Sequence, residues 1–297
     1  MGRGYLAEEI RQKLISILRD SDTGMSGVGI SERIGINRLT MTKYLKVFAA
    51  EGLLRQKSIG NVTLWFLEPG QESFSFPDDY FKVAEMYLEH LTKCSKDSVY
   101  SLVRNCLHSG ASASRLALEV MIPASAEVQK MYDAGKIGSA EQSLMRMILS
   151  ESLQIFVQLP VAADTKRSVI VLAADSQSVI FSEAASAIYH SEGWRVWHLG
   201  DMSHAVDVMF DTDLQKLVGR VWKKKSGLLA VVVFSDTHEG LNFFADSVNP
   251  VRKKSNRIKL ALCGKMPKNA GLECDLATGR IEDILQWSRT VSESMRD

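Results

Sequence analysis

The sequence has little that would indicate an extracellular, membrane-spanning or zinc-binding protein. Its longest apolar run, Leu228 to Phe234, is far too short to span a bilayer, and the N-terminus has no apolar signal core. The cysteines contain no CxxC pair and lie far apart, at Cys94, Cys106, Cys263 and Cys274. We therefore expect reduced thiols rather than disulfides or structural zinc, a cytoplasmic location and no membrane partner.

The usual signatures of catalysis are also missing. There is no GxSxG, GxxxxGK[ST] or GxGxxG stretch, which removes the simplest hydrolase, phosphate-loop and dinucleotide interpretations. None of the six histidines forms an i, i+4 pair on a predicted helix, so no metal site is expected. The net charge is +1, and any affinity for nucleic acid must come from a local patch. These absences predict that the chain is not an enzyme.

The first seventy residues have the pattern of a small helical unit followed by a hairpin. Gly35 marks a tight turn between two short apolar-periodic stretches, and Asn37 is a good N-cap for the second. Gly60-Asn61 is a two-residue hairpin signal. In order, the pattern predicts helices over residues 6–19, 30–34 and 38–51, then strands over residues 53–58 and 62–67.

This unit resembles the winged helix-turn-helix DNA-binding domain, and the resemblance is carried by the stretch ISERIGINRLTMTKYLKVFAAEGLLRQKSIGNVTLWFL. It implies double-stranded DNA as a partner, with one helix in the major groove and the hairpin beside it. The residues expected to contact DNA are Arg38, Thr40, Thr42, Lys43 and Lys46 on the helix, and Arg55, Lys57 and Asn61 on the hairpin. The alternative is a protein–protein module with a solvated helix face.

After a linker at residues 69–79, residues 80–159 carry four apolar-periodic stretches and predict a four-helix bundle. Strands and helices then alternate. Residues 169–173 form a continuous apolar run typical of a buried parallel strand, followed by a helix and a second strand at residues 195–199. A parallel sheet with helices on both faces is expected, with ligands bound beyond the carboxyl ends of its strands.

The second half of the chain resembles cobalamin-binding modules, in which a helical cap precedes a doubly wound domain. The pattern of the family's cap is a Pro that ends one helix, followed by a Val, an aromatic residue, a Gly and an acid with a His after it. This sequence matches all but the last of these positions, where it has Gln instead of His. These residues are Pro123, Val128, Tyr132, Gly135, Glu141 and Gln142. The layout is similar to that of cobalamin-dependent photoreceptor repressors.

The sheet domain departs from the family at its first loop. The family's DxHxxG frame, whose His ligates cobalt, falls here on Asp175, Gln177 and Ile180. An amide is a poor cobalt ligand, and a branched side chain blocks close approach of a nucleotide tail. Ser235 and Gly264 stand at two further loops of the family's site. The cofactor is therefore unknown, and His-ligated cobalamin is not expected.

The fold class predicted is multi-domain α/β: a winged helix at residues 1–69, a four-helix bundle at 79–159 and a doubly wound parallel sheet at 166–297. We expect a homo-oligomeric, dimeric or tetrameric, DNA-binding regulator whose C-terminal module senses a small molecule or mediates association. The degenerate cofactor cleft is predicted at Tyr132, Glu141, Gln142, Asp175, Gln177, Ser235 and Gly264. The alternatives are a corrinoid-carrying methyl-transfer protein, a regulator that binds cobalamin without a protein His ligand, and a structural scaffold.

Overall fold

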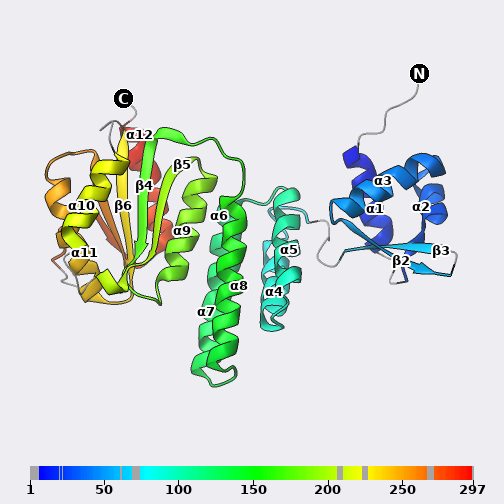
Figure 1. Cartoon of the computed structure of the whole chain (residues 1–297), viewed down its shortest axis with the longest axis horizontal. Helices are drawn as coiled ribbons and strands as arrows, with labels where there is room; N and C mark the ends of the chain where they lie inside the picture. The colour runs from blue at the N-terminus through cyan, green and yellow to red at the C-terminus, as the bar shows by residue number, and fades with distance from the viewer. Residues whose placement is uncertain are drawn as a thin grey trace. The chain divides into compact units, whose positions relative to one another are not determined.

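The computed structural model describes residues 7–19, 21, 23–60, 62–68, 74–205, 210–222, 227–265 and 271–295. The chain divides into two compact units, residues 1–111 and residues 112–297, and Figure 1 labels most of their elements. No helix among the described residues is both long and apolar enough to cross a membrane.

The N-terminal unit begins with three helices, α1 (Ala7–Arg19), α2 (Gly27–Ile34) and α3 (Arg38–Ala50). The Ser26 side chain accepts a hydrogen bond from the backbone of Gly29 and caps α2, which therefore begins three residues before the predicted start. Gly35 ends α2 with φ of 76°, in the left-handed region that favours glycine. Asn37 caps α3 as predicted, through a bond from the Leu39 amide.

An antiparallel sheet completes this part of the unit, with strand order β1-β3-β2. The strands are β1 (Met25–Ser26), β2 (Leu54–Ile59) and β3 (Val62–Leu67). Ile59 pairs with Val62 at the tip of the predicted hairpin, and Trp65 pairs with Met25 of the short first strand. Trp65 is buried with Ile10, Leu14, Leu45 and other apolar side chains of the three helices. The three helices and the two hairpin strands follow in the predicted order, whereas the short strand β1 was not predicted. Assignment of the unit to the winged-helix class stays a prediction.

Helices α4 (Tyr80–Thr92) and α5 (Lys96–His108) belong to the N-terminal unit. The C-terminal unit begins with α6 (Ala113–Arg115), the π-helical stretch η1 (Leu116–Met121), α7 (Ile122–Asp133) and α8 (Ser139–Val157). The expected helix break at Pro123 is wrong, because helical structure continues from Ala113 to Asp133. Proline lacks a backbone N–H, and the adjoining π-helical turn accommodates that missing donor. A four-helix bundle over residues 79–159 stays a prediction.

The rest of the C-terminal unit is built on a parallel sheet with strand order β5-β4-β6-β7-β8. This is a doubly wound order, which reverses direction between β4 and β6. The strands are β4 (Asp164–Ala173), β5 (Trp194–Asp201), β6 (Leu228–Ser235), β7 (Ile258–Gly264) and β8 (Leu276–Thr278).

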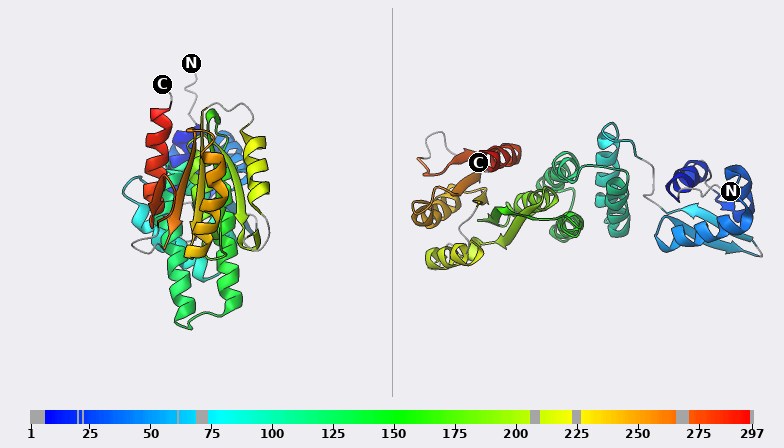
Figure 2. Two further views of the ribbon diagram at one scale, coloured as in Figure 1. Left: turned by 90° about the vertical axis from the view of Figure 1, so that its left-hand side faces the viewer. Right: turned by 90° about the horizontal axis from the view of Figure 1, so that it is seen from above.

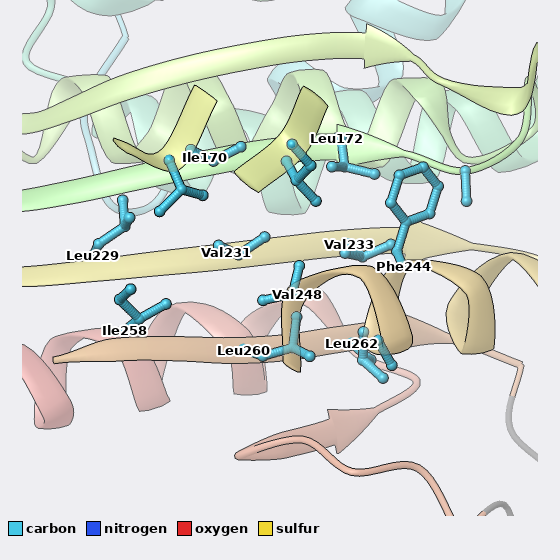
Figure 3. Close-up of a cluster of buried hydrophobic side chains, with 14 of the residues drawn as sticks. Ile170, Leu172, Leu229, Val231, Val233, Phe244, Val248, Ile258, Leu260 and Leu262 are labelled. Atoms are coloured by element: carbon cyan, nitrogen blue, oxygen red, sulfur yellow. The ribbon is translucent and has the colours of Figure 1, made fainter. Parts of the chain in front are cut away.

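Helices cover both faces of this sheet (Figure 2). They are α9 (Val179–Ser191), α10 (Phe210–Val221), α11 (His238–Arg252) and α12 (Ile281–Ser294). Helix α9 contacts β4 and β5, and α12 contacts α9 and β6, whereas α11 contacts β6 and β7 from the other face with α10 beside it. Phe244 and Val248 of α11 pack on alternate residues of the central strands, including Val231 (Figure 3). Helices α9 and α12 contact β6 from the other side, so β6 is buried on both faces, as its uninterrupted apolar sequence predicts.

Candidate functional site

The carboxyl ends of β4 and β6 meet where the strand order reverses, and Asp175 joins them. Its Oδ2 accepts hydrogen bonds from Ser235 Oγ and from the Asp236 amide, both at 2.7 Å. Its Oδ1 accepts from the Ser178 amide at 2.9 Å. A reversal of strand order is where open α/β sheets bind ligands. In this chain a carboxylate with satisfied hydrogen bonds holds the two loops together.

Two opposing effects set the pKa of the Asp175 carboxyl. Partial burial raises the pKa of its carboxyl, and the hydrogen bonds from Ser235, Asp236 and Ser178 outweigh burial, so the pKa lies below its ordinary value. The group is therefore ionised at neutral pH. Its charge is used to fix the loops, which is a structural role for a residue predicted to contact ligand.

Gly264 has a packing role at the same edge of the sheet. It pairs with Ser235 across β6 and β7, and a Cβ built on Gly264 would lie 1.7 Å from the Ser235 carbonyl oxygen. No side chain can occupy that position without moving a backbone. Glycine is therefore required here whether or not a ligand binds.

A cleft separates this edge of the sheet from helices α7 and α8. One cavity, of about 400 Å³, is bounded by α7, by the start of α9 and by the ends of β6 and β7, and its lining includes Gln129, Arg146, Gln177, Asp236 and Lys265. A second, of about 390 Å³, lies between α8 and α9 and is lined by residues that include Gln142, Arg146, Ser150 and Glu183. Both volumes fall within the range of small-molecule sites.

Arg146 on α8 crosses this cleft to the loop after β4. Its guanidinium donates to Gln177 Oε1 at 3.1 Å and to the Ser176 carbonyl at 2.9 Å. Gln177 thus directs its side-chain carbonyl oxygen at a cation of the same chain. Sequence reasoning missed Arg146, because its partners lie thirty and thirty-one residues away and no local pattern joins them.

Glu183 is a second missed residue. Its Oε1 accepts from Ser150 Oγ at 2.7 Å, and its buried Oε2 has no hydrogen-bond partner among the described residues. Burial raises the pKa of its carboxyl, against the smaller lowering effects of Ser150 and Arg146. A signal was available, since Glu183 is the one Asp, Glu, Lys or Arg in α9.

The predicted cap residues are not brought together in the cleft. Gln142 lines the second cavity, and its side-chain amide donates to Gln129 Oε1 at 2.9 Å, which ties α8 to α7. Glu141 instead accepts from the Gly138 amide at 2.9 Å and stabilises the start of α8. Tyr132 is exposed near the end of α7 and lines neither cavity.

The second predicted site is the outer face of α3. Its inner residues Met41, Leu45 and Phe48 are buried, which fixes the opposite face toward solvent. All five predicted contact residues of the helix are exposed there: Arg38, Thr40, Thr42, Lys43 and Lys46. The Thr42 hydroxyl donates to the Arg38 carbonyl at 2.8 Å, so it already has one partner within the helix.

Two of the three predicted contact residues of the hairpin lie among the described residues, and both are exposed. Lys57 is exposed on β2. The guanidinium of Arg55 lies over the ring of Phe66 at 5.3 Å and is therefore partly held by its own hairpin. Asn61 lies outside the described residues. Within the described part of the chain, no cluster of three or more His, Cys, Asp or Glu could hold a metal ion.

No protein family matches the sequence, and no curated protein matches it. Among solved structures, the chain is similar to the monomethylamine corrinoid protein of Methanosarcina barkeri, with 11% identity, coverage of 71% of this chain and 99% of that one, and a TM-score of 0.50. It also matches the methanol:cobalamin methyltransferase complex of Methanosarcina barkeri, with 16% identity, coverage of 76% and 84%, and a TM-score of 0.33. The first likeness shows that most of the chain shares the fold of a corrinoid protein.

Proposed function

We propose that this chain is a DNA-binding transcription regulator in which a corrinoid-protein-like module binds a small molecule or mediates self-association. The observation that carries the proposal is the outer face of α3, where Arg38, Lys43 and Lys46 stand exposed on a helix whose other face is buried. A helix of this kind beside a hairpin suits the major groove, with the hairpin against the flanking backbone.

A single unit of this size offers few phosphate contacts, so useful affinity requires two copies. The C-terminal module supplies the association. Two α3 helices related by a two-fold axis then read half-sites about 34 Å apart, one turn of duplex. A ligand in the cleft changes the spacing of the two helices and thereby the affinity for DNA.

DNA binding is tested by fluorescence anisotropy with a pool of random duplexes, titrated with the full chain at rising salt. Affinity for DNA falls as salt rises, so the slope of log affinity against log salt is negative. In the variant Lys43→Ala/Lys46→Ala this slope should become less negative by about 0.9 for each phosphate that these lysines neutralise in the wild type. A matched control removes two exposed lysines of the other unit, Lys130→Ala/Lys136→Ala, and should leave the slope unchanged. Wild-type protein that shows no salt-dependent binding at micromolar concentration would end this proposal.

A corrinoid-carrying methyl-transfer protein is the second candidate, and the fold comparison favours it over DNA binding. The residues of the cleft do not fit a corrinoid with a protein His ligand. Gln177 offers an amide engaged by Arg146, and the buried Ile180 occupies the position where the family's Gly permits close approach.

Visible absorption shows whether a corrinoid is retained, and electron paramagnetic resonance of its cobalt(II) form, with nitrogen-isotope-labelled protein, shows whether a protein nitrogen binds the cobalt. Protein is incubated with methylcobalamin, desalted and measured. A colourless product excludes the carrier. Retained colour in which the cobalt is bound by a ring nitrogen of the protein supports the carrier and contradicts the misfit described above. Retained colour with unchanged cobalt coordination supports a regulator that binds cobalamin without a His ligand. A scaffold is indicated if neither cobalamin nor DNA binds.

A further inference from the structure

The first turn of α3 presents a large apolar side chain to solvent. Leu39 is 77% exposed, more than any other large apolar residue that the structure describes. Its backbone is held, because the Leu39 amide donates to Asn37 Oδ1 at 2.9 Å and caps the helix. The side chain therefore projects from a fixed point of the helix.

One exposed leucine is ordinary on a protein surface, and the neighbours of Leu39 make this one informative. Arg38 and Thr40 flank it, and Lys43 lies one turn further along the helix, all of them exposed. The N-terminal residues of a helix in the major groove are those that reach base edges. An apolar side chain among cations and hydroxyls in the first turn of the helix suits the major groove, because the base edges there include one apolar group.

That group is the C5 methyl of thymine, which distinguishes T·A from the other base pairs in the major groove. A leucine can bury such a methyl, whereas Arg38 and Lys43 favour phosphates or the acceptor edge of guanine. Sequence reasoning passed over Leu39 because it selected polar and basic residues alone.

We propose that Leu39 is a specificity-determining residue that selects a thymine in the bound DNA through contact with its 5-methyl group. This rests on the proposed DNA-binding function and deepens it. Leu39 gains buried area only where the methyl is present. The preferred duplex therefore contains at least one thymine whose replacement weakens binding without the loss of any hydrogen bond.

The full chain is first used to enrich binding sequences from a library of random duplexes. In the best of these, each thymine is replaced in turn by deoxyuridine, which removes the methyl and leaves the pairing unchanged. At one position the wild type should lose about fourfold in affinity, the factor expected for burial of one methyl group. Leu39→Ala should bind the thymine and uracil duplexes equally.

Val47→Ala is the matched control, because Val47 is also apolar and exposed on α3 but lies two turns beyond the first. It should keep the fourfold thymine preference. Circular dichroism confirms that both variants are folded, as expected for exposed positions. Thymine preference that survives in Leu39→Ala, or that is absent from the wild type, overturns the inference alone. Failure of the wild type to enrich any sequence removes the proposed function and the inference with it.

Discussion

Arg146 is the side chain that joins the helical part of the C-terminal unit to the loop after β4, and its removal should release that loop. Arg146→Ala removes two hydrogen bonds, to Gln177 Oε1 and to the Ser176 carbonyl. A hydrogen bond to a charged group contributes about 1.5–3 kcal/mol when it is well shielded. The guanidinium is partly exposed and water can replace its partners, so we expect about 1–2 kcal/mol for the pair.

Hydrogen–deuterium exchange of the full chain measures this locally. The reporter is the Ser178 amide, which donates to Asp175 Oδ1 in the same loop. A loss of about 1–2 kcal/mol corresponds to an exchange rate about 5- to 30-fold faster. Arg146→Lys should give a smaller increase, because an ammonium keeps the charge and cannot span both acceptors with a planar fork.

The matched control is Arg280→Ala. Arg280 is 71% exposed and pairs with Glu282 at 3.6 Å, on the surface of the same unit. Such a pair contributes at most about 1 kcal/mol, and its loss should leave exchange at Ser178 unchanged. Equal exchange rates for wild type and Arg146→Ala would refute the assignment of Arg146 as a residue that holds the loop after β4.

Three further changes test the cleft and the adjoining edge of the sheet, each by hydrogen exchange in the strands. Burial raises the pKa of Glu183 in the folded protein above its ordinary value of 4.5. The protonated carboxyl is therefore fully compatible with the fold below that pH, and stability is lost as the group ionises at higher pH. Glu183→Gln should be more stable than wild type near neutral pH and should have no advantage below about pH 4.5. Asp175→Asn should destabilise β4 and β6 by about 2 kcal/mol, because three donors lose a charged acceptor, and a loss no larger than that of Ser235→Ala would contradict this. Gly264→Ala should destabilise β7 by about 3 kcal/mol or more through overlap with a backbone oxygen, whereas Gly219→Ala, in open space on α10, should stabilise by about 0.5–1 kcal/mol.

Much of the fold is readable from local patterns. Asn37 is predicted to cap α3, and it does. The apolar runs at residues 169–173 and 228–234 fall within β4 and β6. Pro123 shows the limit of such patterns, since a rule that holds for an α-helix gives the wrong result where a π-helical turn adjoins the proline.

The position of the candidate site is more predictable than the roles of its residues. Strand ends predict Asp175, Ser235 and Gly264 as neighbours, and the structure brings them together. Their roles in the fold do not follow from the sequence. The hydrogen bond between Asp175 and Ser235 joins residues sixty positions apart, and the lack of space for a Cβ at Gly264 depends on the backbone of a neighbouring strand. Arg146 and Glu183 escape sequence reasoning because their partners are equally distant along the chain.

The sequence by itself determined most of the helices and strands, the cap of α3 and the amide at position 177, because each depends on residues a few positions apart. The tertiary structure alone decided that Arg146 engages that amide and that Glu183 of α9 accepts a hydrogen bond from Ser150 of α8. Periodicity reports which face of an element is apolar. Which polar groups meet across the packed elements is set by distances between helices and strands, and those exist only once the chain has folded.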